Sequence, residues 1–365
     1  MTPGRRASRR PVASGIGEGE VADLQPVRVT VAFPTIGRWF LLRQAIQSIL
    51  RNPRRDVRVV VVDNASGDET RTEISKLLKE DARLRYVRYE ERVHPHANWN
   101  RCIEAAGGAD YLAIFHDDDL YEPEILDRQI EFLDRHPSVG FVGTGYWIID
   151  ERGEVRGSSS ARRGGGVIPG EAFIRDLMRR AGSFITCPSV MYRKIALERI
   201  GFDAGVDPRG GDYLTWLKMA ERWDVGYIPT PLMRYRRHAR QGSASAGLGS
   251  GTVAVFRNLS RYASSVAENR PERRAEAEAW IRAVRRRCLA RLLSYGLEDC
   301  GDSPAERVRF VSQVSEICPV GGGVVAKVGL LIGRPLKRWG LFRIAMNLLR
   351  REGRTDWSAP ERSAV

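Results

Sequence analysis

The stretch VRVTVAFPTIGRWFLLRQAIQSIL (residues 27–50), with the following VRVVVVD (residues 57–63), decides the fold. Residues 27–33 are a β-branched run, which is typical of a buried strand. Apolar residues then recur at helical spacing: Leu41, Leu42, Ala45, Ile46, Ile49 and Leu50. Residues 57–63 form a second strand-like run, which ends at the turn-former Asn64. A strand, a helix and a strand in this order predict two parallel strands joined by a helix.

The same alternation continues along the chain. A helix is expected over residues 68–79, a strand over LRYVRYE (84–90), a helix over 97–106, a strand over YLAIF (111–115) and a helix over 122–136. This order predicts an α/β fold with a mostly parallel sheet wrapped by helices. Ligands of such sheets bind beyond the carboxyl ends of the strands. The polar residues found there are Pro34, Thr35, Asp63, Asn64 and the cluster of residues 116–119.

The cluster HDDD (residues 116–119) contains three adjacent carboxylates directly after an apolar strand. Carboxylates packed side by side repel one another, so such a cluster favours a bound cation. Oxygen ligands select hard ions such as Mg²⁺ or Mn²⁺, which can bridge and neutralise a diphosphate. A solvated acidic loop, or a cap for the helix that begins near Glu122, explains the cluster equally well when it is taken alone.

Composition limits the classes of partner and compartment. The chain has 365 residues, a net charge of +14 and an isoelectric point near 10.0, which favours anionic partners without selecting one. The five cysteines show neither a CxxC pair nor zinc-ligand spacing, and their scatter is typical of reduced thiols in a cytosol. The N-terminus lacks the apolar core of a secretory signal. The sequence contains no stretch of about 20 apolar residues, so no transmembrane helix is expected. We therefore expect a cytoplasmic protein.

Five segments carry a family resemblance through their order along the chain. They are VAFPTIGRWFLLRQAIQSIL (31–50), VVVVDNASGDET (59–70), NWNRCIEAAGGADYLAIFHDDDLYEP (98–123), CPSVMYRKIALERIGFD (187–203) and GGDYLTWLKMAERW (210–223). Together they resemble the family 2 glycosyltransferases, over about residues 27–238. The resemblance implies a GT-A (Rossmann-like) fold and the transfer of a sugar, with inversion, from a nucleoside-diphosphate sugar.

The resemblance assigns donor-binding roles residue by residue. Pro34, Thr35 and Arg38 match the nucleotide pocket. Asp63 matches the aspartate that accepts the N3–H of uracil or thymine, a task that suits an ionised carboxylate because it only accepts hydrogen bonds. A plain turn is the alternative for Asp63.

The acidic cluster matches the family's DXD motif, which holds Mg²⁺ or Mn²⁺. Asp118 takes the metal-binding place, with Asp119 beside it as a further metal contact. Asp117 and Asp119 flank Asp118 and are expected to contact the ribose or a metal-bound water. His116 stands where many members carry the first aspartate, so the carboxylate that contacts the ribose stays open.

Two further segments match with departures. Asn98-Trp99-Asn100 replaces the usual Ala-Arg-Asn, so Asn98 and Asn100 are expected to face the donor without the arginine's phosphate contact. The start of a structural helix is an equal alternative for them. His238, in YRRHARQGS, matches a segment that closes near the diphosphate, although a lone histidine is more often structural.

Asp212, in GGDYLTW, matches the second residue of the family's Glu-Asp pair, the general base that takes the acceptor's proton. Gly211 replaces the glutamate of that pair. The alternative for Asp212 is an N-cap of a helix over residues 213–222, and the two roles are compatible.

The domain boundaries follow from changes in composition. Residues 1–25 are predicted to form a disordered basic tail, 26–245 the GT-A domain, 252–351 a helical C-terminal extension and 352–365 a second tail. Residues 152–166 are predicted to form a Gly/Ser/Arg-rich loop. Within 320–351, LKRWGLFRIAMNLLRR (336–351) separates apolar from basic residues, which fits either a helix on anionic lipid or a helix packed on the catalytic domain.

The sequence thus predicts a glycosyltransferase of cell-surface polysaccharide or glycoconjugate synthesis. Its expected partners are a UDP- or dTDP-sugar donor, a glycan or lipid-linked acceptor and, through residues 320–351, an anionic membrane surface at the inner face of the cell membrane. Two alternatives remain. A metal-dependent sugar nucleotidyltransferase also uses clustered aspartates, but it does not need Asp212. A nucleic-acid-binding protein is suggested only by the positive net charge. We expect no nucleic-acid partner, because the basic residues are spread along the chain instead of clustered.

Overall fold

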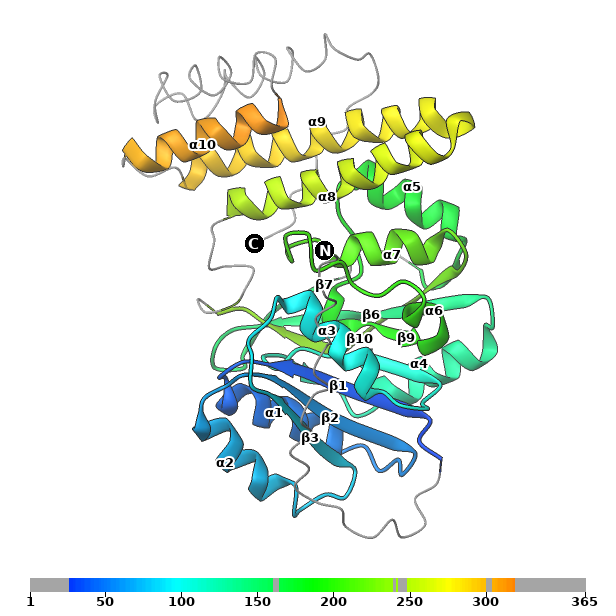
Figure 1. Cartoon of the computed structure of the whole chain (residues 1–365), viewed down its shortest axis with the longest axis vertical. Helices are drawn as coiled ribbons and strands as arrows, with labels where there is room; N and C mark the ends of the chain where they lie inside the picture. The colour runs from blue at the N-terminus through cyan, green and yellow to red at the C-terminus, as the bar shows by residue number, and fades with distance from the viewer. Residues whose placement is uncertain (1–25, 160–163, 239–240, 242–247, 300–303, 319–365) are drawn as a thin grey trace, which may run out of the picture. The chain divides into compact units, whose positions relative to one another are not determined.

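A computed structural model describes residues 26–159, 164–238, 241, 248–299 and 304–318. The described residues divide into two compact units. The first is drawn from Met1–Leu177 and Gly182–Ser245, and the second from Met178–Ala181 and Ala246–Val365. Figure 1 shows the strands of the first unit and the long helices of the second.

The first unit is built on one ten-stranded sheet. Its strands are β1 (Val29–Thr35), β2 (Val57–Asn64), β3 (Leu84–Tyr89), β4 (Tyr111–Ile114), β5 (Leu120–Tyr121), β6 (Val139–Ile149), β7 (Val155–Ser159), β8 (Gly166–Ile168), β9 (Met191–Arg193) and β10 (Asp224–Arg236). The order is β3-β2-β1-β4-β9-β6-β10-β5, with β7 paired to β6 and β8 to β10. Neighbours β3, β2, β1 and β4 are parallel, as the strand–helix alternation predicted.

Helices cover the sheet on both faces. Those of the first unit are α1 (Trp39–Leu50), α2 (Asp68–Leu77), α3 (Pro95–Ala105), α4 (Ile125–Arg135), α5 (Gly170–Arg180, whose last residues belong to the second unit), α6 (Lys194–Glu198) and α7 (Asp212–Ala220). Apolar residues of α1, α2 and α4 pack with Val29, Val31 and Phe33 of β1 in one core. Helix α3 lies on the other face, where Thr30 donates a hydrogen bond to the carbonyl of Ala106 at 3.1 Å.

Two sequence predictions need correction. Residues 155–159 were expected in a loop but form strand β7, antiparallel to β6. Their backbone pairs with Tyr146–Ile149, and this pairing does not depend on their small side chains. Helix α7 begins at Asp212 and ends at Ala220, and Gly211 holds the N-cap position that was the alternative role for Asp212.

The second unit is helical, as its composition predicted. It contains α8 (Leu248–Asn269), α9 (Arg274–Asp299) and α10 (Pro304–Ile317). The predicted tails and the amphipathic segment 320–351 lie outside the described residues. Within the described ranges, no helix is both long and apolar enough to span a bilayer.

Candidate functional site

The register of β1 and β4 brings the first polar cluster together. The two strands are parallel neighbours, with Ala32 opposite Ile114, so their carboxyl ends lie at one edge of the sheet. At this edge the hydroxyl of Thr35 donates a hydrogen bond to Oδ2 of Asp117 at 2.6 Å. We call Asp117, Asp118 and Asp119, together with His116, the acidic site.

Cationic and polar groups from distant parts of the chain surround the acidic site. The guanidinium of Arg38 contacts Oδ1 of Asp117 at 2.5 Å and Oδ2 of Asp118 at 2.9 Å. His238 places Nε2 3.2 Å from Oδ2 of Asp118. The structure thus brings together Thr35, Arg38 and His238, which the sequence placed at the donor site.

Arg236, at the end of β10, fixes the cluster through its backbone and side chain. Its backbone N–H donates to Oδ1 of Asp119 at 2.8 Å, and its Nε–H donates to the carbonyl of Asp118 at 2.9 Å. The arginine is 3% exposed, so this contact belongs to the interior of the site. Arg236 therefore connects strand β10 to the acidic site.

The three carboxylates are all buried, and the charges around them separate their pKa shifts. Burial raises the pKa of Asp117 to about 6, against the opposing charge of Arg38. It also raises the pKa of Asp119 well above its ordinary value, and the neighbouring charge of Asp118 adds to the effect. Burial acts on Asp118 in the same direction, but His116, Arg38 and His238 hold its pKa below the ordinary range. Asp118 is thus the carboxylate that these surroundings keep ionised.

Three atoms of the acidic site are buried without a hydrogen-bond partner. They are Oδ1 of Asp118, Oδ2 of Asp119 and Nε2 of His116. One ring nitrogen of His116 and one carboxylate oxygen of each aspartate also lie within 4.8 Å of one another. Unpaired buried polar atoms are costly, and these are the ligand types of a divalent cation. The residues fit a metal site, and no second such group occurs among the described residues.

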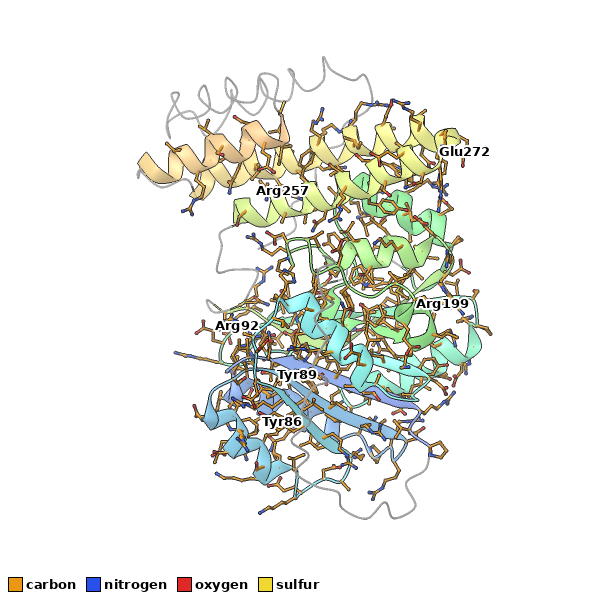
Figure 2. The ribbon with its side chains drawn as sticks, viewed as in Figure 1. Tyr86, Tyr89, Arg92, Arg199, Arg257 and Glu272 are labelled. Atoms are coloured by element: carbon orange, nitrogen blue, oxygen red, sulfur yellow. The ribbon has the colours of Figure 1, made fainter. Side chains whose placement is uncertain are left out.

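Asp63 lies at the end of β2 and is fully buried, with both oxygens engaged. Its Oδ1 accepts the backbone N–H of Ser66 at 2.9 Å, and its Oδ2 accepts the hydroxyl of Tyr86 at 2.5 Å. Burial and this hydrogen bond raise the pKa of Tyr86, so the phenol stays a donor. Figure 2 labels Tyr86 and Tyr89 on the neighbouring strand β3. The base-binding role of Asp63 stays a prediction, because a base has to share Asp63 with Tyr86.

The other donor-site predictions have structural partners. Asn98 donates to the carbonyl of Val62 at 3.2 Å, and its Oδ1 is buried without a partner. Asn100 forms two bonds of 2.8 Å with the backbone of Phe202, so it joins α3 to the loop before α7. Pro34 is partly buried at the end of β1. The binding roles of these residues stay predictions.

Asp212 is buried in the first turn of α7, with 8% of the residue exposed. Burial raises its pKa to about 7, although the backbone N–H groups of Asp212 and Tyr213 oppose the shift. The thiol of Cys187 has its pKa raised by desolvation, and the charges of Asp212 and Asp119 both add to that rise. The candidate base therefore lies in the neighbourhood of the acidic site, with a pKa matched to neutral pH.

The space next to Asp212 explains why Gly211 stands where the family carries glutamate. A Cβ added at Gly211 lies 2.1 Å from Cε1 of His96, so the imidazole occupies that space. His96 is fully buried, its Nδ1 lies 2.9 Å from the carbonyl of Asp203, and its Nε2 has no partner. Sequence reasoning missed His96, whose only signal was its place three residues before Trp99, which it contacts at a ring distance of 5.0 Å.

Comparison with known proteins identifies this arrangement. Residues 30–201 match the model of glycosyl transferase family 2. This stretch of the chain is a family 2 glycosyltransferase domain. The fold of the first unit is the GT-A fold that the family resemblance implied, and a solved structure of Staphylococcus aureus TarS agrees, with a TM-score of 0.57 at 15% identity over 89% of this chain and 92% of that one.

Curated relatives support the family assignment. The putative glycosyltransferase EpsE of Bacillus subtilis is 30% identical over 51% of this chain and 64% of its own length. A glucosyltransferase of Campylobacter jejuni, named for GalNAc(5)-diNAcBac-PP-undecaprenol, is 24% identical over 63% of this chain and 71% of its own. An uncharacterized glycosyltransferase of Rickettsia felis is 25% identical over 58% of this chain, which spans only 33% of that relative.

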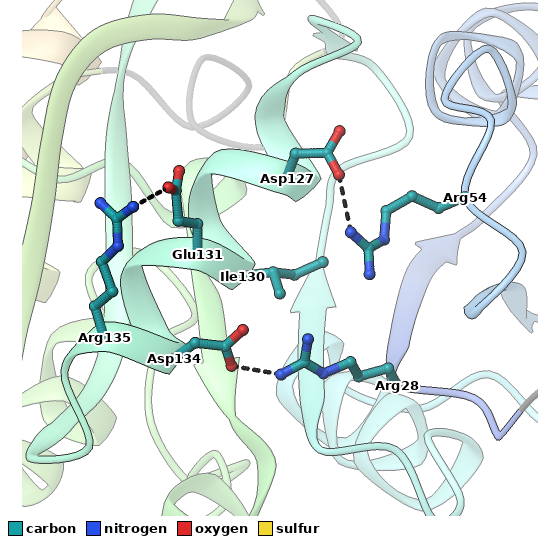
Figure 3. Close-up of a pocket in the computed structure, with 7 residues that line it drawn as sticks. All are labelled: Arg28, Arg54, Asp127, Ile130, Glu131, Asp134 and Arg135. Atoms are coloured by element: carbon teal, nitrogen blue, oxygen red, sulfur yellow. Dashed lines mark hydrogen bonds and ion pairs between the residues drawn. The ribbon is translucent and has the colours of Figure 1, made fainter.

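A second charged region lies at the opposite edge of the sheet, where Arg28 precedes β1. It is a pocket of about 370 Å³ lined by Arg28, Arg54, Asp127, Ile130, Glu131, Asp134 and Arg135. Figure 3 shows its acidic and basic side chains joined in pairs. Arg28 pairs with Asp134 at 2.5 Å and Arg54 with Asp127 at 3.0 Å. We call this region the charged pocket, and each of its three carboxylates is paired with an arginine.

Proposed function

We propose that this family 2 domain is an inverting glycosyltransferase that moves a sugar from a UDP- or dTDP-linked donor to a hydroxyl group. The observation that carries the proposal is the acidic site, whose buried unpaired oxygens lie at the carboxyl ends of parallel strands. Such edges bind ligands in open α/β sheets. The proposed acceptor is a glycan, lipid-linked or otherwise, of the cell surface, and the name of the Campylobacter jejuni relative supports that class.

The residues of the acidic site would hold the diphosphate end of the donor. Asp118 and Asp119 offer oxygens to a Mg²⁺ or Mn²⁺ ion, which when bound supplies positive charge beside the departing nucleoside diphosphate. Arg38, whose side chain is 27% exposed, is placed to exchange a carboxylate contact for a phosphate oxygen, since guanidinium groups bind both in the same bidentate way. His238 contributes a second nitrogen at Asp118. Asp117, which accepts the hydroxyl of Thr35, is the proposed contact of the ribose.

Asp212 would act as the general base. It removes the proton of the acceptor hydroxyl as the hydroxyl oxygen attacks the anomeric carbon. The bond from that carbon to the diphosphate oxygen breaks on the opposite side, and the oxygen leaves with the electron pair. One displacement inverts the configuration. A pKa of about 7 keeps about half of Asp212 ionised at neutral pH and keeps it basic enough to take the proton.

The test is a thermal-shift series on the full chain with UDP, dTDP, GDP and ADP, each with and without Mn²⁺. A ligand that binds only the native state raises the free energy of unfolding by RT ln(1 + [L]/Kd). We expect UDP or dTDP with Mn²⁺ to give the largest shift, since Asp63 is the candidate partner of the N3–H of uracil and thymine. Equal shifts for all four nucleotides would remove the role of Asp63, and no shift with any of them would overturn the proposed function.

A further inference from the structure

The geometry points to a further metal ligand: we propose that the imidazole of His116 binds the divalent cation directly, which makes a mixed nitrogen and oxygen site that prefers Mn²⁺ to Mg²⁺. The inference rests on the proposed function, because it assigns a ligand in the metal site proposed there. It concerns a position at which this chain departs from the aspartate that many members of the family carry.

The first observation is the unpaired state of the ring. Nε2 of His116 is buried without a hydrogen-bond partner, and so are Oδ1 of Asp118 and Oδ2 of Asp119. Asp118 and Asp119 are 4% and 0% exposed, so water does not compensate their oxygens at the surface. Each of these three buried atoms can offer a lone pair to a cation. A cation satisfies all three at once.

The second observation is distance. The ligand atoms of His116, Asp118 and Asp119 lie within 4.8 Å of one another. Ligands about 2.1 Å from a common ion lie at most about 4.2 Å apart. A separation of 4.8 Å therefore has to close by about 0.6 Å for two opposite ligands, and by more for adjacent ones, through rotation of the side chains.

The third observation is that the histidine is already fixed in place. The hydroxyl of Tyr121 accepts the backbone N–H of His116 at 2.8 Å. The imidazole lies against the ring of Trp99, with 5.8 Å between centroids. Trp99 replaces the arginine usual at that position. An uncharged indole therefore lies beside His116, in place of a positive side chain that would compete with a cation. Both departures from the family pattern thus lie side by side.

The chemistry of the ligand set gives the expected selectivity. Carboxylate and water ligands suit Mg²⁺ and Mn²⁺ alike, whereas imidazole nitrogen favours the transition metal. Mg²⁺ also gives up its water ligands reluctantly. Replacing an aspartate oxygen by a histidine nitrogen therefore shifts preference toward Mn²⁺.

The test measures the metal and its ligand atoms, not turnover. Mn²⁺ bound to the full chain with UDP is studied by electron paramagnetic resonance, in which a coordinated histidine gives nitrogen modulation of the electron spin echo. The variants are His116→Gln, His238→Gln and, as a control away from the site, His136→Gln. His116→Asp, which restores the residue of many relatives, is the second variant should His116→Gln fold poorly. Circular dichroism of the metal-free proteins reports folding.

We expect His116→Gln to weaken Mn²⁺ binding about tenfold or more, to leave Mg²⁺ binding nearly unchanged and to remove the nitrogen signal that remains in His238→Gln. His116→Asp should keep the ion but lose both the signal and the preference for Mn²⁺. If the signal and the Mn²⁺ affinity survive in both His116 variants, the inference is overturned, while the proposed function stands as long as UDP and Mn²⁺ still bind. If wild-type protein binds neither UDP nor Mn²⁺, both fall.

Discussion

The acidic site and the charged pocket are both built from carboxylates and arginines, but they differ in burial and in pairing. In the charged pocket each carboxylate has an arginine partner, and the Arg28–Asp134 side chains are 37% and 36% exposed. In the acidic site Asp118 also pairs with an arginine, Arg38, at 2.9 Å, but its side chain is only 5% exposed and its second oxygen has no partner.

The difference teaches where binding energy is available. An exposed ion pair is already satisfied by its partner and by water, so it contributes little and binds nothing further. A buried carboxylate with an unpaired oxygen has lost its water without full compensation, so a ligand that supplies the missing charge gains from it. Asp212 shares the burial of the acidic site but not its unpaired oxygens, and burial raises its pKa to about 7. The comparison therefore predicts large functional effects at buried carboxylates and small structural effects in the charged pocket.

The largest effect is expected for Asp212→Asn. The amide keeps the shape of the side chain but cannot take a proton, so turnover should fall about 10²- to 10⁴-fold. Binding of the nucleotide with Mn²⁺, measured by calorimetry, should stay within about threefold of wild type, because Asp212 acts on the acceptor side. Near-normal turnover would reduce Asp212 to a structural residue of α7. Asp134→Asn, in the charged pocket, is the matched control and should turn over normally.

The pH profile of wild-type turnover sharpens the same point. The base works in its deprotonated form, and its pKa is raised to about 7. The rate should therefore fall about 50-fold between pH 7 and pH 5, approaching tenfold per pH unit at the acid end, and level off above about pH 8. Initial rates with saturating donor and Mn²⁺ measure this. A profile that stays flat down to pH 5 would contradict an elevated pKa at the base.

The next effect concerns Asp118→Asn. Removing its charge should abolish the Mn²⁺-dependent part of the stabilisation by UDP, which reaches about 2.7 kcal/mol at a ligand concentration of 100 Kd. Asp134→Asn removes an equivalent arginine-paired carboxylate from the charged pocket and should leave that stabilisation unchanged. Thermal shifts of the two variants and wild type, with and without Mn²⁺, decide the matter. Equal losses in both variants would erase the distinction between the two regions.

A smaller effect is expected at the contact of Gly211 with His96. Gly211→Ala places a methyl group in the space of the imidazole, so it should destabilise the chain by about 1–3 kcal/mol. In a His96→Ala background the same change should cost much less, since the ring is gone. Urea midpoints of the two single variants and the double variant give the coupling between the sites. Additive losses would show that the cost of the methyl group does not come from the ring.

The sequence predicted the strand and helix alternation well, because each element carries its own signal. Residues 27–33 and 57–63 are continuous apolar runs, and the helix between them repeats its apolar residues at helical spacing. It missed β7 because Gly157, Ser158 and Ser159 lack strand-forming side chains, and their pairing with β6 is decided by the backbone. A prediction from side-chain pattern alone has no access to such pairing.

The candidate site was predictable only in part, for the same reason. The match to the family model confirms the family, and the GT-A fold is confirmed with it. The residues that modify the site come from tertiary contact. Tyr86 reaches Asp63 across the β2–β3 register, and His96 fills the place left by Gly211. Neither contact follows from spacing along the chain.

The smallest effect is expected within the charged pocket itself. A double-mutant cycle on Arg28→Ala and Asp134→Asn should give a coupling of about 0.2–1 kcal/mol, because both side chains are more than a third exposed and water screens the pair. Asp134→Asn alone should cost somewhat more than the pair, since the carboxylate also accepts the hydroxyl of Tyr111 at 2.7 Å. Urea unfolding at low and high salt measures the cycle, and the coupling should shrink with added salt. A salt-resistant coupling of several kcal/mol would mean that the pocket stores binding energy as the acidic site does, and the contrast between the two regions would fail.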